Sequence, residues 1–160
     1  MTPEPPRTGP PPLHPFGLRL HHDGRWTHEG MPFLNRKLRA AFDRSVRYLP
    51  EEGKYVVQLR HFRGEIEVEE AAFFVRTFDT DNGSIALSDG SEEPLDVSSL
   101  VASPNDAALL CRVKRQLAAE GLLARFQQAA QAELLLAVEE TAEGYGLRCG
   151  GVLQTLPDAV

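Results

Sequence analysis

The sequence lacks three features that would place it among membrane, secreted or disulfide-bonded proteins. No apolar run approaches the roughly 20 residues that a membrane helix needs, so we expect no membrane partner and no spanning segment. Residues 1–15, MTPEPPRTGPPPLHP, contain no apolar stretch typical of a secretory signal. The two cysteines, Cys111 and Cys149, are therefore predicted to be reduced thiols of a cytoplasmic protein.

Positive charge is also scarce overall, and it is unevenly distributed. The formal net charge is −6, which argues against a nucleic-acid partner, because such partners are bound through phosphate neutralisation. Residues 16–63 contain ten Lys or Arg and five Asp or Glu, whereas residues 64–160 contain six and seventeen. This layout suits ion pairing within the chain or head-to-tail self-association into a homo-oligomer, although differently charged solvated faces would give the same pattern.

The length and composition are those of a globular protein with its own core. The chain has 160 residues, of which 42% are hydrophobic and 25% charged. A chain of this size buries about 68–70% of its unfolded surface, so it needs neither a disulfide nor a metal to fold. Seven prolines in residues 1–15 predict a disordered tail, with order beginning near Phe16. Residues 16–70 and 71–152 are predicted to form two small subdomains, and residues 153–160 a loose C-terminus.

The N-terminal half begins with a predicted hairpin and helix. Residues 18–21 and 25–28 alternate in polarity on either side of Asp23-Gly24, as the strands of a hairpin do. Residues 34–49 repeat apolar side chains at helical spacing, and Pro50 ends the helix. The apolar positions that define this face are Leu34, Leu38, Ala41, Phe42, Val46 and Leu49.

The opposite side of this predicted helix is strongly basic. Its charged residues are Arg36, Lys37, Arg39, Arg44 and Arg47, opposed only by Asp43. Because the apolar side is committed to the core, the basic side is free to meet an acidic surface. We hypothesise that it contributes to self-association or to docking of a partner.

The remaining pattern predicts an α+β fold with mainly antiparallel strands. Further strands are expected at residues 54–60, 65–69, 73–78, 84–87, 107–113 and 145–149. Asn82-Gly83 favours a type I′ turn. Residues 122–141 are rich in Ala, Gln, Leu and Glu, which predicts a second helix. Each subdomain would then carry one principal helix, which hints at a diverged structural repeat.

Three segments resemble part of a ligand-binding motif, and none is complete. The histidine-rich hairpin at residues 21–28 lacks a third converging ligand for a metal. The acidic turn at residues 79–83 lacks the Glu at position twelve of a calcium loop. The glycine-rich residues 144–151 follow a helix, where a dinucleotide-binding loop must follow a strand. We therefore predict no catalytic residues, no metal and no cofactor.

Several short motifs carry a family resemblance over roughly residues 17–151. The first is DGRWTHEGMP at residues 23–32, followed later by IEVEEA at residues 66–71. Others are GKYVV at residues 53–57, DGS at 89–91, LCRVK at 110–114 and LARF at 123–126. Together they resemble the bacterial domain-of-unknown-function family 1285. The resemblance implies two small α+β subdomains with related motifs, and a signalling or regulatory role without an assigned activity.

Two classes of function remain open. The first is a non-catalytic cytoplasmic module that binds a protein partner or a small ligand in a regulatory role. The second is a small-molecule enzyme with a site assembled from dispersed residues, for which His28, Arg36 and Glu67 are the polar candidates. Trp26 is expected to be buried against Leu38 and Phe42, or else to border a binding groove with Tyr55 and Arg36. The candidate binding residues are Trp26, His28, Arg36, Arg39, Arg44, Tyr55 and Glu67.

Overall fold

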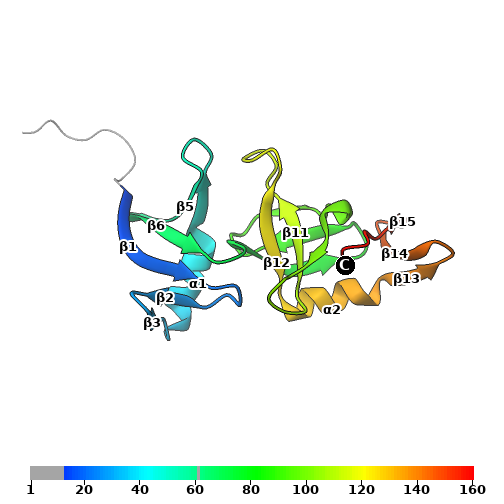
Figure 1. The fold of residues 1–160 in the computed structure, drawn as a ribbon, viewed down its shortest axis with the longest axis horizontal. Coiled ribbons are helices and arrows are strands. Elements are labelled where there is room, and N and C mark those ends of the chain that lie inside the picture. The colour runs from blue at the N-terminus through cyan, green and yellow to red at the C-terminus, as the bar shows by residue number, and fades with distance from the viewer. Residues whose placement is uncertain (1–12, 61) are drawn as a thin grey trace, which may run out of the picture.

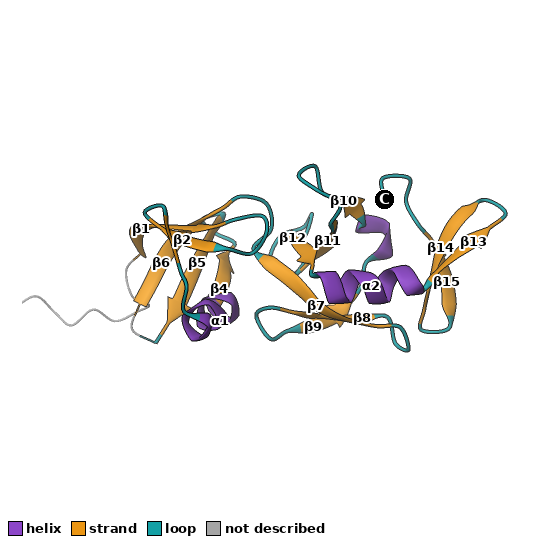
Figure 2. Ribbon diagram, turned by 90° about the horizontal axis from the view of Figure 1, so that it is seen from below, coloured by secondary structure: helices purple, strands orange, loops and turns teal. Residues whose placement is uncertain are grey.

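The computed structural model describes residues 13–60 and 62–160, which form three β-sheets arranged along an elongated molecule (Figure 1). The predicted α+β class is confirmed. Two six-stranded sheets make up two small subdomains, and a three-stranded sheet follows at the far end (Figure 2). Among the described residues, no helix has the length and apolar character needed to cross a membrane.

The N-terminal subdomain is built from the first sheet and one helix. Its strand order is β3-β2-β1-β6-β5-β4. The strands are β1 (Leu13–Leu20), β2 (Trp26–His28), β3 (Met31–Pro32), β4 (Val46–Leu49), β5 (Lys54–Leu59) and β6 (Phe62–Val68). Helix α1 (Arg36–Ser45) lies between β3 and β4 in the chain. Phe42 of α1 packs its ring against Trp26, with the ring centroids 5.5 Å apart.

The C-terminal subdomain contains the second sheet, in the order β10-β11-β12-β7-β8-β9. Its strands are β7 (Phe73–Asp79), β8 (Ser84–Leu87), β9 (Glu92–Pro94), β10 (Val101–Ala102), β11 (Leu109–Val113) and β12 (Leu122–Phe126). A short 3₁₀ helix, η1 (Val97–Ser99), connects β9 to β10. Helix α2 (Gln128–Leu136) leads to the third sheet. That sheet consists of β13 (Val138–Thr141), β14 (Gly144–Cys149) and β15 (Val152–Thr155).

The two six-stranded sheets have the same topology. In each, two three-stranded antiparallel meanders are joined by a parallel pairing of the first strand with the last, β1 with β6 and β7 with β12. The connection between the meanders is helical in both, as α1 in the first sheet and as η1 in the second. The predicted repeat is therefore present in the strand order. The two longer helices are not equivalent, because α2 follows the last strand of its sheet.

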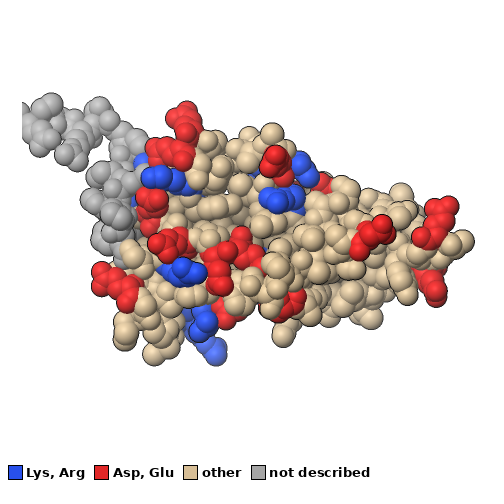
Figure 3. All heavy atoms as spheres, viewed as in Figure 1, with Lys and Arg blue, Asp and Glu red and all other residues tan. Residues whose placement is uncertain are grey.

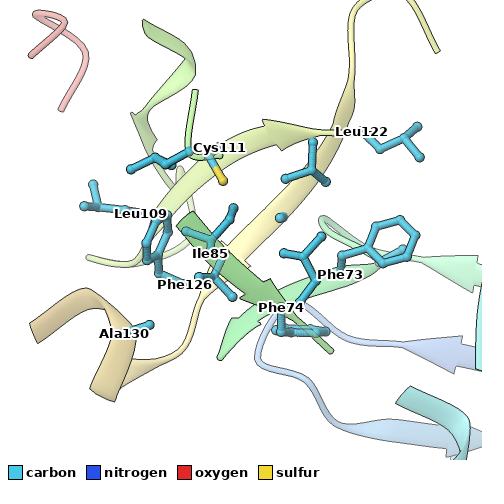
Figure 4. Packing of buried hydrophobic residues seen from close by; sticks show 14 of the residues in the cluster. Phe73, Phe74, Ile85, Leu109, Cys111, Leu122, Phe126 and Ala130 are labelled. Carbon is cyan, nitrogen blue, oxygen red and sulfur yellow. The ribbon is translucent and has the colours of Figure 1, made fainter. Parts of the chain in front are cut away.

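A continuous hydrophobic core runs through both subdomains. In Figure 4, Phe126 and Ile85 lie beside Ala130 of α2, while the ring of Phe73 points toward the N-terminal subdomain. There it meets Tyr55, with the ring centroids 6.2 Å apart. The core thus joins the two sheets rather than leaving them as separate units.

Helix α1 is shorter than predicted. It ends at Ser45, and Val46–Leu49 forms strand β4, which pairs with β5. Val46 is fully buried. An apolar residue at this position fits the apolar face of a helix and the inward face of a strand equally well. The predicted apolar face is also incomplete, because Leu34 and Leu38 are exposed. Arg47 accordingly lies on β4 and not on the basic side of the helix.

The predicted second helix is also wrong at both ends. Residues 122–141 form strand β12, helix α2 and strand β13 in succession. Residues 122–126 form a strand and not the start of a helix because β12 pairs with β11 on one side and with β7 on the other. In the expected hairpin of β7 and β8, only Gly83 of the Asn82-Gly83 pair has a positive φ, so the turn is not type I′.

The two ends of the chain differ from the prediction where they are described. Residues 1–12 of the expected disordered tail lie outside the described residues, and β1 already begins at Leu13. The C-terminus is not loose throughout, since β15 pairs with β14 and the amide of Ala102 donates to the carbonyl of Ala159. Both cysteines are unpaired and buried. Burial raises the pKa of the Cys111 thiol to about 12.

Candidate functional site

A cleft of about 810 Å³ lies between the two subdomains and is the candidate site. The N-terminal subdomain contributes the turn between β1 and β2 and one residue of α1. The C-terminal subdomain contributes β7, the segment before β11, the end of β12 and one side of α2. Its lining includes Asp23, Gly24, Asp43, Phe74, Asp106, Arg125, Gln128, Ala132 and Leu135. In Figure 3, acidic side chains gather where the two subdomains meet.

Asp43 holds the N-terminal wall of the cleft. Its Oδ1 accepts a 2.8 Å hydrogen bond from the indole Nε1 of Trp26. Its Oδ2 lies 3.6 Å from Nη2 of Arg76 on β7, which makes an ion pair between the subdomains. Burial raises the pKa of Asp43, and this effect outweighs the lowering by Trp26 and Arg76. Asp43 thus lines the cleft and is hydrogen-bonded to Trp26 in the core.

The turn at Asp23-Gly24 brings backbone close to the opposite wall. Gly24 has φ +89°, and a Cβ there would lie 3.6 Å from the ring of Phe74. Asp23 accepts hydrogen bonds from the amide and from Nε of Arg25. Burial raises the pKa of Asp23, but these hydrogen bonds and the Arg25 charge leave it below its usual value. The carboxylate therefore remains ionised at neutral pH.

The C-terminal wall is fixed by Arg125 of β12. Its guanidinium donates to Glu70 at 3.0 Å and also to Asp106, and the arginine side chain is only 11% exposed. Glu70 accepts further hydrogen bonds from Ser103 and from Asn105, at 2.6 and 2.7 Å. The hydrogen bond from Arg125 also holds the pKa of Asp106 below its usual value. The Arg125 guanidinium is therefore held in place by Glu70 and Asp106.

The lining of the cleft combines charged and amide side chains with apolar ones. Its polar surface consists of carboxylates, glutamine amides and one guanidinium that is already paired, around an apolar floor that includes Phe74 and Leu135. Among the described residues, its lining contains no hydroxyl, thiol, amine or imidazole side chain. Carboxylates in a partly buried setting favour a cationic group, and an apolar floor favours a hydrophobic body.

A second polar cluster lies in the core near the junction of the subdomains. The Nζ of Lys114 lies 2.7 Å from Asp89 and 3.1 Å from Oγ of Ser91, and both charged side chains are about nine-tenths buried. The ammonium group also lies over the ring of Phe73, 5.0 Å from its centroid. Lys114 has φ +55°, a left-handed conformation that is unusual for a lysine. Two of the motifs noted in the sequence, DGS and LCRVK, therefore meet in one buried ion pair.

The seven predicted site residues do not assemble into one site, and none of them lines the cleft. Trp26 is 1% exposed and belongs to the core, as expected from its predicted contact with Phe42. Tyr55 packs between Tyr48 and Phe73, and burial raises its pKa to about 12. Because Trp26 is buried, it does not border a groove with Tyr55 and Arg36, and its indole contacts the cleft only through Asp43.

The basic residues of α1 are distributed around the helix. Arg36 and Arg44 are exposed, whereas Arg39 is half-buried, with its Nε lacking a hydrogen-bond partner among the described residues. Their predicted role in binding stays a prediction.

The dispersed enzyme site is not brought together either. His28 pairs with Leu18, whose side chain faces the core, while Glu67 pairs with Arg19 on the outer face. Residues paired across neighbouring strands share a face, so His28 and Glu67 lie on opposite sides of the sheet. Glu67 makes an exposed ion pair with Arg19 at 3.4 Å. Among the described residues, no group of three His, Cys, Asp or Glu is placed to hold a metal ion.

The residues of the cleft were only partly signalled by the sequence. Asp43 stood out as the one acidic residue on the basic side of the predicted helix. Glu70 and Arg125 both lie in motifs that carry the family resemblance. Asp106 and Gln128 had no signal of their own, since they lie in segments whose sequence resembles ordinary polar surface.

These features define a class of protein: two α+β subdomains of equal strand topology, with a ligand-sized cleft between them. That fold is the fold of a DUF1285 family protein. The solved structure of such a protein from Silicibacter pomeroyi DSS-3 matches 91% of this chain and 82% of its own, with a TM-score of 0.62 and 17% identity. The resemblance inferred from the sequence is thus confirmed at the level of the fold.

A second solved structure, a DUF1285 family protein from Shewanella baltica OS155, is matched over 75% of this chain and 91% of its own. Its TM-score is 0.48 and its identity 15%. No family model matches the sequence, and no curated protein matches it.

Proposed function

We propose that the protein is a non-catalytic binding module of the bacterial cytoplasm, with a regulatory or signalling role. Its ligand is a small molecule or a peptide segment that carries a cationic group on an apolar body. The ligand occupies the cleft between the subdomains, with the cationic group near Asp43 and the apolar body against Phe74 and Leu135.

The observation that carries this proposal is that the cleft takes its walls from both subdomains. A ligand there contacts the β1–β2 turn and α1 on one side, and β12 and α2 on the other. Binding therefore couples the two sheets, and a ligand that prefers one relative orientation of the subdomains shifts the population toward it. Such a coupling is what a regulatory module requires.

Charge within the cleft supports a cationic ligand. The side chain of Arg76 is 42% exposed and lies 3.6 Å from Asp43, so an incoming cation can replace it at small cost. Arg125 differs, because it is nearly buried and held by Glu70 and Asp106. A ligand carboxylate or phosphate would have to compete with these carboxylates for Arg125. The cation that a ligand can replace is therefore Arg76, which pairs with Asp43 and is not itself part of the lining.

The test is a thermal-shift screen of the intact protein against amines, guanidines, amino acids, nucleotides and basic peptides. A ligand at 100 times its dissociation constant stabilises the folded state by about 2.7 kcal/mol, which raises the melting temperature visibly. We expect shifts with cationic compounds that have an apolar portion. Shifts confined to anionic compounds, or no shift with any class, would refute the proposal.

A matched pair of variants places the ligand in the cleft. Ala132 lines the cleft on α2, so Ala132→Trp fills the cleft and should abolish the ligand-induced shift. Ala129 is also exposed on α2 and is not part of the lining, so Ala129→Trp serves as the control and should bind as the original protein does. Equal binding by both variants would locate the ligand elsewhere.

A further inference from the structure

An apolar groove of about 430 Å³ lies on the C-terminal end of the molecule, between α2, the third sheet and the last residues of the chain. Its floor contains buried or half-buried side chains, and its sides remain open to solvent. Leu135 is 53% exposed, Tyr145 59% and Val160 44%. Large apolar side chains exposed together in a concave site are typical of a docking surface.

The rim of this groove is acidic. Glu143 and Asp158 line it and are exposed. Glu140 lies on β13 opposite Tyr145 and extends the acidic surface. In Figure 3, acidic side chains mark the end of the molecule formed by β13 and β14. The occupant of the groove should therefore combine apolar anchors with positive charge.

The opposite end of the same chain has this combination. Met31 on the edge strand β3 is 71% exposed, and Leu34 just before α1 is 84% exposed. The exposed Arg36 and Lys37 follow directly in the first turn of α1. Two apolar side chains three residues apart can enter a groove of this size, while the basic residues reach its rim. We call Met31, Leu34, Arg36 and Lys37 the basic end.

The basic end and the groove lie at opposite ends of the elongated molecule, so one chain cannot place its basic end in its own groove (Figure 1). We infer that the groove receives Met31 and Leu34 of a second copy of this chain, with Arg36 and Lys37 facing Glu143 and Asp158. The contact is head-to-tail, so it continues into chains or closes into a ring. It goes beyond the proposed ligand cleft, because the two surfaces share only Leu135.

Sedimentation velocity on the full chain tests self-association. At about 0.01 M salt, where the Debye length is about 30 Å, the average mass should rise with protein concentration. At about 1 M salt, where it is about 3 Å, the association constant should fall at least tenfold. A protein that stays monomeric at low salt up to the highest soluble concentration would overturn the inference.

Reciprocal charge reversal identifies the two surfaces. Arg36→Glu with Lys37→Glu makes the basic end acidic, and Glu143→Lys with Asp158→Lys makes the rim basic. Each double variant alone should lose association about tenfold or more, because like charges then meet. An equimolar mixture should regain it, since each reversed end finds an opposite partner. If the mixture stays monomeric, the contact is not the one inferred.

Two controls separate the surface from general charge and from folding. Glu51→Lys with Glu52→Lys, in the exposed turn between β4 and β5, changes the net charge as much as the rim variant and should associate normally. Leu34→Gln removes an exposed apolar anchor without touching the core and should weaken association with unchanged circular dichroism. Loss of association in the charge control, or full association with Leu34→Gln, would contradict the inference.

Discussion

Trp26 has two roles at one position. Its ring fills the core against Phe42, and its Nε1 donates to the Asp43 carboxylate that lines the cleft. The rotamer of Asp43, and with it the carboxylate offered to a ligand, is therefore set by a residue that is itself inaccessible to that ligand. Substitutions at Trp26 should affect both stability and binding.

Trp26→Ala should lower the free energy of unfolding by about 3–5 kcal/mol, the range for truncating a buried large aromatic residue. Urea unfolding followed by circular dichroism measures the loss. Trp26→Phe retains most of the packing and removes only the hydrogen bond to Asp43, so its loss should be about 1–3 kcal/mol. Equal stability of the Ala variant and the original protein would contradict the core position of Trp26.

Asp89 and Lys114 form an ion pair that is about nine-tenths buried, so its loss should be costly. Asp89→Ala leaves the ammonium without its partner and should destabilise the fold by about 3–5 kcal/mol. Asp89→Asn keeps an acceptor for the lysine and should lose less. Exposed ion pairs contribute roughly 0.2–1 kcal/mol to stability. If Asp89→Ala lowers the free energy of unfolding by no more than that, water reaches the lysine.

The same pair predicts a dependence of stability on pH. Burial raises the pKa of Asp89, but hydrogen bonds from Lys114 and Ser91 outweigh burial and leave the pKa lowered. A carboxyl whose pKa is lowered by folding stabilises the protein above its unfolded-state pKa. That stabilisation is lost as the pH falls below about 3.9 and through the folded-state value. Asp89→Asn should flatten this part of the curve of unfolding free energy against pH.

At the scale of the elements, the two helices begin differently. The side chain of Asn35 caps α1 by accepting from the amide of Leu38 at 3.1 Å, whereas Gln127 at the start of α2 makes no such bond. Asn35→Ala should therefore cost about 1 kcal/mol, and Gln127→Asp should add a similar amount of stability. Thermal unfolding of both variants checks the signs. A destabilised Gln127→Asp variant would show that the N-terminus of α2 is satisfied by other groups.

Local pattern predicted most of the elements and failed where pairing decided between two structures. Val46 fits the helical face of α1, but its fully buried position is in β4, paired with Val57 of β5. Residues 122–126 alternate buried and half-buried side chains, a period of two within a stretch of strong helix formers. Their partners on β7 and β11 are distant in the chain, so propensity could not reveal the pairing.

The cleft was beyond prediction for the same reason. Asp43, Asp106 and Arg125 come from a helix, a loop and a strand, and only the packing of the two sheets brings them together. The sequence did predict the Asp23-Gly24 turn, because that signal is local. The seven predicted site residues came from the shared motifs, from the basic side of the predicted helix and from the polar candidates for a dispersed site. They do not meet in the structure, because Trp26 is buried and the strand register places His28 and Glu67 on opposite faces of the sheet.

At the scale of the whole molecule, the continuous core predicts cooperative unfolding. Trp26, the only tryptophan, reports on the N-terminal subdomain, while Ile85 is buried in the C-terminal one. Ile85→Ala should cost about 2–5 kcal/mol and shift the midpoints of Trp26 fluorescence and circular dichroism together. Leu34→Ala, at an exposed position, should shift neither. A fluorescence midpoint that is unmoved by Ile85→Ala would mean that the subdomains unfold independently.

Each six-stranded sheet is joined at its centre by the pairing of its first strand with its last, and this sets an order for synthesis. The N-terminal sheet can be completed once β6 has left the ribosome, whereas β7 waits for β12. Until then, Phe73, Phe74 and Val75 lie on an unpaired strand edge, the kind of surface that promotes aggregation. We therefore expect this edge of β7 to stay exposed to aggregation from the synthesis of β7 until that of β12.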